Sequence, residues 1–287
     1  MNLLTNTILL DEDELRMVLK DIQNGQNDWD EKNKSLIVQS MINHIGSIDS
    51  ELRDNLIYGS FCQLIIEKNI LEHNMLKKLL DLSINELLFK GIEENGTDTV
   101  FIRSFTSLLV ALILYRDNED NFLSKSTVYK IKDRLIDYIN LENDLRGYVS
   151  VKGWAHSIAH VADAFEELIK NPKINQESFI EILKMLWNKI FVSTSVYIHD
   201  EDERILIPIL EMLNRGLEQK EIETLVQNIP IQLKNQKEQI EEEQYWFLYS
   251  NCKTFLKSFY IKVESNRDLI PLRNSLKKCL SVISLYN

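Results

Sequence analysis

The sequence predicts an all-α protein built from stacked antiparallel helix pairs. Apolar residues recur at intervals of three and four along nearly the whole chain, clusters of turn-forming residues separate these runs, and the 287 residues include only 8 Gly and 4 Pro. Hairpins, dinucleotide-binding turns and phosphate loops depend on glycine, whereas helices do not. A β-rich or nucleotide-loop architecture is therefore disfavoured.

The expected helices follow one another in order between the turn-forming clusters. The apolar spacing in residues 52–65 and 76–87 matches one face of a helix with 3.6 residues per turn. The breaks fall at Asn24-Gly25, Gly46, 91–96, 118–120, Asn171-Pro172 and Arg215-Gly216. The charged segment 232–244 is expected to be a solvated helix face, and the aromatic cluster 245–247 that follows it to be core.

Three segments align as a weak internal repeat. Ser60-Phe61, Ser104-Phe105 and Gly153-Trp154 are each expected to begin a helix, and each has an aliphatic residue four positions after its aromatic. Their offsets lie near the ~40–47 residues of HEAT and armadillo repeats. We therefore expect a HEAT/armadillo-like α-solenoid, with a compact helical bundle as the alternative.

The domain organisation and the cellular location are predicted from what the chain lacks. No linker rich in Pro, Gly or Ser divides it, so a single domain over residues 1–287 is expected, with residues 1–45 as an N-terminal cap. The first cationic residue is Arg16, after the acidic run 11–14, which is unlike a secretory signal. The uncharged, strongly apolar run 104–115 is shorter than the ~20 residues of a membrane span. We expect a cytoplasmic protein with no membrane partner.

Charge and cysteine usage narrow the partners and the chemistry. A formal net charge of −11 opposes binding to nucleic acid, which is itself a polyanion. The three cysteines are far apart and sit among apolar neighbours, so they are expected to be buried, reduced thiols. The motifs GxxxxGK[ST], GxSxG and CxxC are absent. The expected partner is a protein, a peptide or a small molecule.

One concentration of unusual chemistry lies between residues 146 and 167. On a helix, His156, His160, Asp163 and Glu167 would follow the i, i+4, i+7, i+11 pattern and share one face. Trp154 would lie on the opposite, apolar face, with alanines between the two. The histidines are therefore expected to line a groove.

Metal binding is one hypothesis for this stripe. Two histidines four residues apart can share a divalent metal with a nearby carboxylate, here His156, His160 and Asp163. A zinc protease of the H-E-x-x-H type would need glutamate after the first histidine, where this chain has Ser157. The alternative is structural: each ring donates one hydrogen bond and fixes adjacent helices.

A second polar cluster contains Asp202, Glu203 and Arg204, about one repeat after the histidines. Carboxylates are favoured in the first turn of a helix, so simple capping explains the cluster. In a solenoid, however, the same residues would lie beside the histidine helix and complete its site. Upstream, Arg146 and Tyr148 lie in a loop that leads into that helix.

These stretches resemble a family of bacterial proteins of unknown function with HEAT-like helical repeats. The resemblance rests on RGYV at 146–149, GWAH at 153–156, the AH and AD pairs up to residue 163, and DER at 202–204. It implies that the two polar clusters belong to one feature. It implies no activity.

The leading hypothesis is a binding protein, not primarily an enzyme, whose groove beside the histidines holds a peptide, a small ligand or a metal. One alternative is a metal-dependent hydrolase that uses the same residues. Another is an interaction scaffold with purely structural histidines. The candidate ligand-binding residues are Arg146, Tyr148, Trp154, His156, His160, Asp163, Asp202, Glu203 and Arg204.

Overall fold

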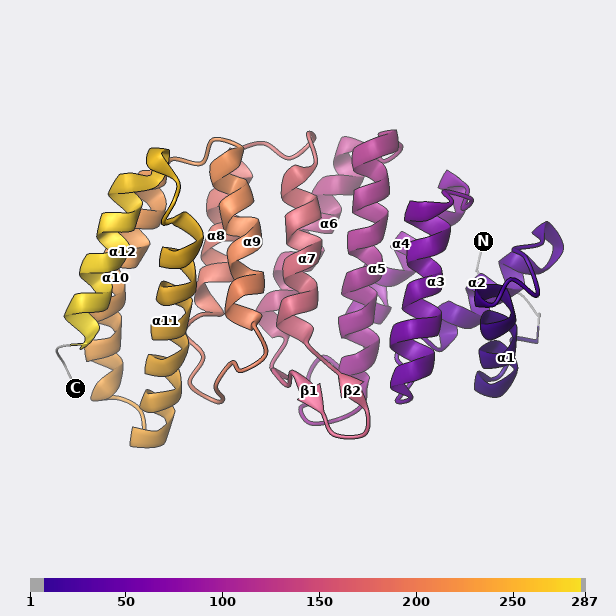
Figure 1. The fold of residues 1–287 in the computed structure, drawn as a ribbon, viewed down its shortest axis with the longest axis horizontal. Coiled ribbons are helices and arrows are strands. Elements are labelled where there is room, and N and C mark those ends of the chain that lie inside the picture. The colour runs from indigo at the N-terminus through magenta and orange to yellow at the C-terminus, as the bar shows by residue number, and fades with distance from the viewer. Residues whose placement is uncertain (1–7, 285–287) are drawn as a thin grey trace. The chain divides into compact units, whose positions relative to one another are not determined.

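A computed structural model describes residues 8–284, and the regular structure of these residues is almost all helical (Figure 1). The all-α prediction is confirmed. The chain divides into two compact units, Met1–Asn171 and Pro172–Asn287. The single domain over 1–287 stays a prediction, as does the cap over 1–45, of which residues 1–7 lie outside the described residues.

Unit 1 contains seven α-helices, three short helical segments and one hairpin within its described residues. In chain order they are α1 (Glu12–Gln23), α2 (Glu31–Asn43), η1 (Glu51–Tyr58), α3 (Gly59–Cys62), η2 (Gln63–Glu67), α4 (His73–Asn85), η3 (Leu87–Phe89), α5 (Thr99–Asp120), α6 (Lys125–Leu141), β1 (Tyr148–Val149), β2 (Gly153–Trp154) and α7 (Ser157–Lys170). The segments η1 and η2 are π-helical and flank the single α-helical turn of α3.

Local sequence explains where several of these helices begin and end. Asp11 caps α1 by accepting a hydrogen bond from the Glu14 amide, and the Glu14 side chain returns the bond in a capping box. Ser124 caps α6 in the same way, with its hydroxyl accepting from the Thr127 amide. Asn121 ends α5 in the left-handed conformation that asparagine tolerates.

Helix α5 is the centre of unit 1. It packs along α7 and also against α4, and its apolar side chains are buried on nearly every face. Among residues 8–284 it is the one helix long and apolar enough to cross a membrane, but 78% of its most apolar window is buried within the fold. That degree of burial is typical of a core helix.

Unit 2 consists of five α-helices and one short 3₁₀ segment within its described residues. They are α8 (Glu177–Asn188), α9 (Glu201–Asn214), α10 (Gln219–Lys237), α11 (Glu242–Val263), η4 (Arg267–Leu269) and α12 (Ile270–Ser284). Helix α12 packs against both α10 and α11, and α9 packs against α11. Trp187, Phe255 and Phe259 form an aromatic core in edge-to-face contacts.

The aromatic cluster 245–247 and the cysteines agree only in part with their predicted burial. Tyr245 is buried as expected, whereas Trp246 is exposed, because successive residues of α11 point in different directions around the helix. All three cysteines are free thiols; Cys252 and Cys279 are buried, and Cys62 is half-buried. Burial raises the pKa of the Cys279 thiol to about 12.

The predicted repeat is wrong in its helix starts. Ser60-Phe61 lies in the middle of the helical segment 51–67, and Ser104-Phe105 lies inside α5, which begins at Thr99. Gly153-Trp154 is not helical at all but forms β2. The similar local sequences therefore occupy three different structural positions, and the solenoid arrangement stays a prediction.

Candidate functional site

The RGYV and GWAH segments form the two arms of one hairpin, β1–β2, which lies at the foot of α5 and α7 (Figure 1). Tyr148 pairs with Trp154, and Val149 pairs with Gly153. Two further backbone bonds extend the pairing: the Ala155 amide donates to the Gly147 carbonyl at 2.8 Å, and the His156 amide donates to the Arg146 carbonyl at 2.9 Å.

The predicted helical stripe begins too early in the sequence. Helix α7 starts at Ser157, and His156 precedes it in the left-handed conformation, with φ of 50°. Trp154, predicted on the apolar face of the same helix, belongs to β2. The backbone must turn sharply from strand into helix here, and His156 takes the conformation that makes this turn. Three of the four residues of the predicted stripe, His160, Asp163 and Glu167, lie within α7.

An unbroken series of aromatic rings runs from the hairpin surface into the core. The ring of Tyr148 meets Trp154 edge-on at 5.1 Å, and Trp154 stacks on His156 at 4.8 Å. The His156 ring then meets His160 at 5.6 Å, and His160 meets Phe105 of α5 at 5.2 Å. Exposure falls along the series, from 54% for Tyr148 and 38% for Trp154 to 8% for His160.

His160 is a buried anchor and not the groove residue that the sequence predicted. Its Nδ1 lies 2.7 Å from Ser104 Oγ, and the Ser104 hydroxyl donates its proton to the Ala155 carbonyl. A hydroxyl has one proton to give, so Nδ1 must itself carry a proton and donate it to Ser104. This arrangement fixes the tautomer and the orientation of the imidazole.

Buried Arg53 of η1 binds the hairpin through hydrogen bonds to its backbone carbonyls. Its Nη1 donates to the Ser47 carbonyl at 2.7 Å, and its Nη2 donates to the Lys152 carbonyl at 2.8 Å and the Trp154 carbonyl at 3.4 Å. Lys152 directly precedes β2, and Trp154 is its last residue. One guanidinium therefore satisfies backbone oxygens from two segments about a hundred residues apart, which buried carbonyls require.

The environment of Arg53 is unusual for a charged group. The guanidinium lies over the rings of Phe101, at 4.3 Å, and Phe105, at 4.8 Å, and its Nε is 2.8 Å from an oxygen of Asp54. Burial lowers the pKa of Arg53 and raises the pKa of Asp54, while the attraction between the two groups opposes both shifts.

Gly153 allows the hairpin to approach η1 closely. It has φ of 80°, and a Cβ atom built on it would lie 2.7 Å from the Cβ of Ser50, nearer than real Cβ atoms come. Both the conformation and the contact require glycine. Val151 at the hairpin tip also has positive φ, 71°, which is a costly conformation for a β-branched residue.

A second buried arginine fixes the segment between α6 and β1 that leads into the hairpin. Arg103 of α5 and Glu142 are both fully buried and form two parallel bonds, of 2.7 Å from Nε and 2.9 Å from Nη2. The same carboxylate accepts from the Tyr138 hydroxyl and from the Asp144 amide. Burial lowers the pKa of Arg103, but bonding to Glu142 outweighs this effect and raises it overall.

Arg146 belongs to the same polar framework. Its Nε and Nη2 bond the buried carboxylate of Asp144 at 2.8 and 2.6 Å, and the hydrogen bond to that carboxylate raises the pKa of Arg146. Asp144 also accepts from the Gly96 amide, and its carbonyl accepts from the Ser157 hydroxyl at the start of α7. Arg146 therefore has a positioning role in the structure, whereas Tyr148 and Trp154 project at the surface.

The described residues do not present the predicted three-ligand metal centre. Within residues 8–284, no group of three or more His, Cys, Asp and Glu side chains is arranged to hold a metal ion. The ring of His156 lies against Trp154, the Nδ1 of His160 faces Ser104, and Asp163 is half-buried on α7. Metal binding at His156, His160 and Asp163 stays a prediction.

The second polar cluster lies in the first turn of α9, in unit 2. Asp202 is buried and accepts a 2.6 Å bond from the Ser258 hydroxyl of α11; burial raises the pKa of its carboxyl. Glu203 forms a 2.9 Å ion pair with Lys262, also on α11. These bonds connect α9 to α11, and a joint site of Asp202, Glu203 and Arg204 with His156 stays a prediction.

Sequence reasoning missed the residues that support the hairpin. Arg53, Ser104, Arg103 and Glu142 are far from the histidines in sequence, and all four are fully buried or nearly so. One signal was available: Arg103 interrupts the apolar run of a core helix, and a charge in that position needs a buried partner.

The sequence identifies the family of this protein. A family described as "Protein of unknown function (DUF2785)" matches residues 88–261, which include α5, the hairpin, α7 and most of unit 2. Neither the curated proteins nor the solved structures yield a match. Because the match covers more than half of the 287 residues, the chain belongs to the DUF2785 family of proteins of unknown function.

Proposed function

We propose that this chain is a helical-repeat binding protein that holds a peptide or a protein segment. The contact surface is the aromatic face, defined as the side chains of Tyr148, Trp154 and His156. The observation that carries the proposal is that two large aromatic rings stay exposed although the backbone that bears them is held by hydrogen bonds to buried Arg53. The helical repeat would form a HEAT-like solenoid, and the protein would act in the cytoplasm.

Exposed aromatic rings on a fixed backbone suit recognition. Trp and Tyr bury much apolar area for little loss of side-chain freedom and dominate the energy of many interfaces. Here Trp154 is held by ring contacts on both sides, with Tyr148 and with His156. Its carbonyl is also bonded to Arg53. Because the surface is ordered before a partner arrives, binding loses less entropy.

The hydrolase alternative has less support. A serine nucleophile next to histidine needs its proton available to the imidazole and a route for the substrate. Ser104 is fully buried, and its proton goes to the Ala155 carbonyl. A metal-dependent reaction would need His156 to leave Trp154 in order to join two further ligands.

Selection of peptides from a random displayed library, with the full chain as bait, tests the proposal. Selected peptides would be synthesised and their affinities measured by fluorescence anisotropy. We expect Trp154→Ala to weaken binding at least about tenfold, which is typical of an interface anchor. Trp246→Ala is the matched control, because Trp246 is also an exposed tryptophan but lies on α11.

Two outcomes would contradict the aromatic face as the binding surface. One is that the selected peptides bind Trp154→Ala as tightly as the parent protein. The other is that Trp246→Ala removes binding equally. Metal analysis of protein purified without a histidine tag separates the metal hypothesis: stoichiometric zinc, lost in His156→Ala, would favour the metal site over the aromatic face.

A further inference from the structure

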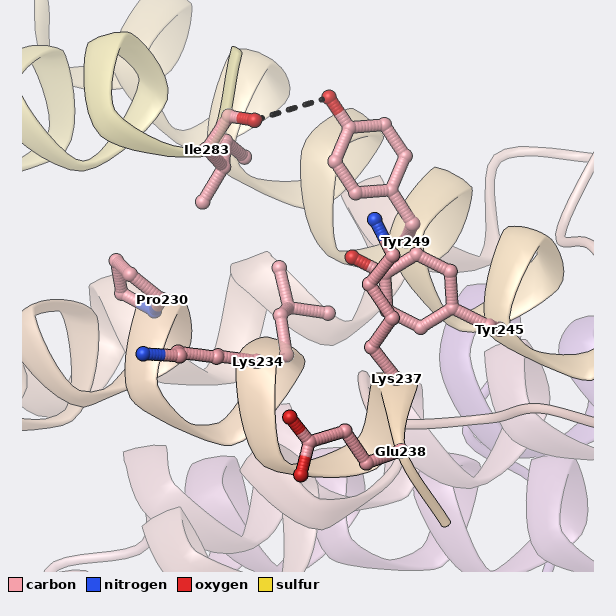
Figure 2. Close-up of a pocket in the computed structure, with 8 residues that line it drawn as sticks. Pro230, Lys234, Lys237, Glu238, Tyr245, Tyr249 and Ile283 are labelled. Atoms are coloured by element: carbon pink, nitrogen blue, oxygen red, sulfur yellow. Dashed lines mark hydrogen bonds between the residues drawn. The ribbon is translucent and has the colours of Figure 1, made fainter. Parts of the chain in front are cut away.

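We propose that unit 2 carries a separate small-molecule site, in the cavity between α10, α11 and α12, and that it takes an amphipathic carboxylate. The cavity measures about 210 Å³. Figure 2 shows Pro230 and Lys234 of α10 on one side of this space, Tyr245 and Tyr249 of α11 on the other, and Ile283 of α12 above them. The site lies wholly within unit 2 and is independent of the aromatic face.

The walls of the cavity are mainly apolar. Pro230, Leu233 and Ile283 supply aliphatic surface, and Tyr245 and Tyr249 supply two rings. The Tyr249 hydroxyl donates to the Ile283 carbonyl at 3.5 Å and accepts from Lys253 at 3.3 Å. The hydroxyl is thus bonded within the protein, and the ring forms part of the apolar wall of the cavity. Small-molecule sites combine such apolar walls with a few polar groups.

The polar groups at the cavity have a net positive charge. Lys234 and Lys237 line it against a single carboxylate, Glu238. Lys237 Nζ lies 5.5 Å from the centre of the Tyr245 ring, and Lys253 Nζ lies 5.2 Å from the centre of the Tyr249 ring. In a chain with a net charge of −11, a cationic rim beside an apolar cavity favours an anionic ligand over a cationic one.

A simpler role for the lysines accounts for only part of this arrangement. Lys234 and Lys237 lie in the last turn of α10, where cations complement the helix dipole. That role needs no cavity and no aromatic wall. The convergence of three helices on an open space with two tyrosine rings is not explained by helix capping, and an aliphatic or aromatic acid of modest size fits both the walls and the rim.

Calorimetric titration of the full chain with octanoate, octanol and octylammonium tests the site. The three probes share one apolar chain and differ in charge. We expect octanoate to bind about tenfold more tightly than octanol, with octylammonium the weakest. The double variant Lys234→Gln/Lys237→Gln should weaken octanoate binding about fivefold or more and leave octanol unchanged, because each lysine contributes mainly Coulomb attraction.

The matched control is Lys277→Gln/Lys278→Gln, which removes two exposed lysines of α12 that do not line the cavity. It should bind octanoate as the parent protein does. The proposal is overturned if octanoate does not bind, if the three probes bind equally, or if the control variant loses as much affinity as the Lys234/Lys237 variant.

Discussion

The base of the hairpin in unit 1 and the aromatic core of unit 2 hold their helices together with different kinds of side chain. Beneath the hairpin, Arg103 and Glu142 are fully buried while Trp154 projects at the surface. In unit 2, Phe255 and Phe259 are buried, and the lysines that line its cavity are exposed. The first region is therefore held by a buried ion pair, and the second is held by packed aromatic rings.

The difference shows what each kind of interior achieves. A buried ion pair contributes little net stability because both charges lose their hydration. It does, however, supply donors and acceptors to irregular backbone: Arg103 bonds the carbonyls of Lys90 and Gly91, and Arg53 bonds those of Lys152 and Trp154. Unit 2 uses the same device once: the buried Asn251 side chain of α11 accepts from the Tyr197 amide and donates to the Val192 and Ser195 carbonyls of the loop before α9. The buried polar side chains Arg53, Arg103 and Glu142, here called the polar base, thus set the shape of the hairpin.

The largest effect is expected where the polar base is broken. Glu142→Gln leaves the buried charge of Arg103 without its carboxylate, which costs about 3–5 kcal/mol of unfolding free energy. Phe259→Leu in the apolar core keeps most of its packing and should cost less, about 1–2 kcal/mol. Urea unfolding at pH 7, followed by circular dichroism, measures both values.

A double variant makes this test sharper. Replacing both partners, Arg103→Met with Glu142→Leu, removes the unpaired charge but leaves the Lys90 and Gly91 carbonyls and the Asp144 amide without their partners, so stability should not return to that of the parent protein. If Glu142→Gln costs less than Phe259→Leu, the two interiors do not differ in the way described.

Close approach of the hairpin to η1 gives the next largest effect. Gly153→Ala combines a strained φ with a 2.7 Å clash against Ser50, so we expect a loss of about 2–4 kcal/mol. Gly25→Ala is the matched control: Gly25 also has positive φ, 71°, but nothing lies within 4 Å of the added atom. Its cost should be limited to about 1–2 kcal/mol. If thermal unfolding shows equal losses of stability for Gly153→Ala and Gly25→Ala, the close contact between the hairpin and η1 is not what requires glycine at residue 153.

The two histidines should differ in their contribution to stability, because His160 is buried and His156 belongs to the aromatic face. His160→Ala removes a buried ring and leaves Ser104 without a partner for its oxygen, so about 2 kcal/mol of stability should be lost. His156→Ala removes a half-exposed ring and should cost less than about 1 kcal/mol. Denaturant titration of the two variants checks this order. A larger loss for His156→Ala would contradict this difference.

The smallest effect concerns pH and the acidic turn of α9. Burial raises the pKa of Asp202, so the folded state holds its proton more tightly than the unfolded state. The carboxyl therefore favours folding below its unfolded pKa of about 3.9, and this contribution is lost as the pH rises through the folded pKa.

Asp202→Asn should accordingly gain up to about 1 kcal/mol at pH 7, and the gain should disappear in acid. Asn can still accept the Ser258 hydrogen bond. Glu203→Gln, which breaks an exposed ion pair with Lys262, is the control and should change stability by less than about 1 kcal/mol. Unfolding midpoints measured from pH 3 to pH 7 check both variants, and a loss of stability for Asp202→Asn at pH 7 contradicts the expected sign.

The helices were predictable because their signal is local, whereas the hairpin carries little such signal. Apolar periodicity indicates the helices, and the Asn171-Pro172 break follows directly on Lys170, where α7 ends. Strands of two residues are too short to show alternation, so the GWAH segment was interpreted as helix. The available signal was a pair of glycines, Gly147 and Gly153, each directly before an aromatic residue.

The supporting framework could not be predicted because its contacts join distant parts of the chain. Arg103 and Glu142 are 39 residues apart, and Arg53 and Lys152 are 99 apart. The residues next to either member of such a pair give no indication of which distant residue it will contact. For the same reason, the spacing of His156 and His160 predicted a shared face but not that one ring is buried and the other half-exposed.

The hairpin tip offers a position for chemical labelling. Val151 is 92% exposed, and the register of the hairpin is held from its base by Arg53 and Gly153, so the tip side chain contributes little to the fold. The native thiols are protected by burial, fully for Cys252 and Cys279. A cysteine placed at residue 151 would therefore react selectively with a fluorescent dye, which gives a direct optical report when a molecule docks beside Trp154.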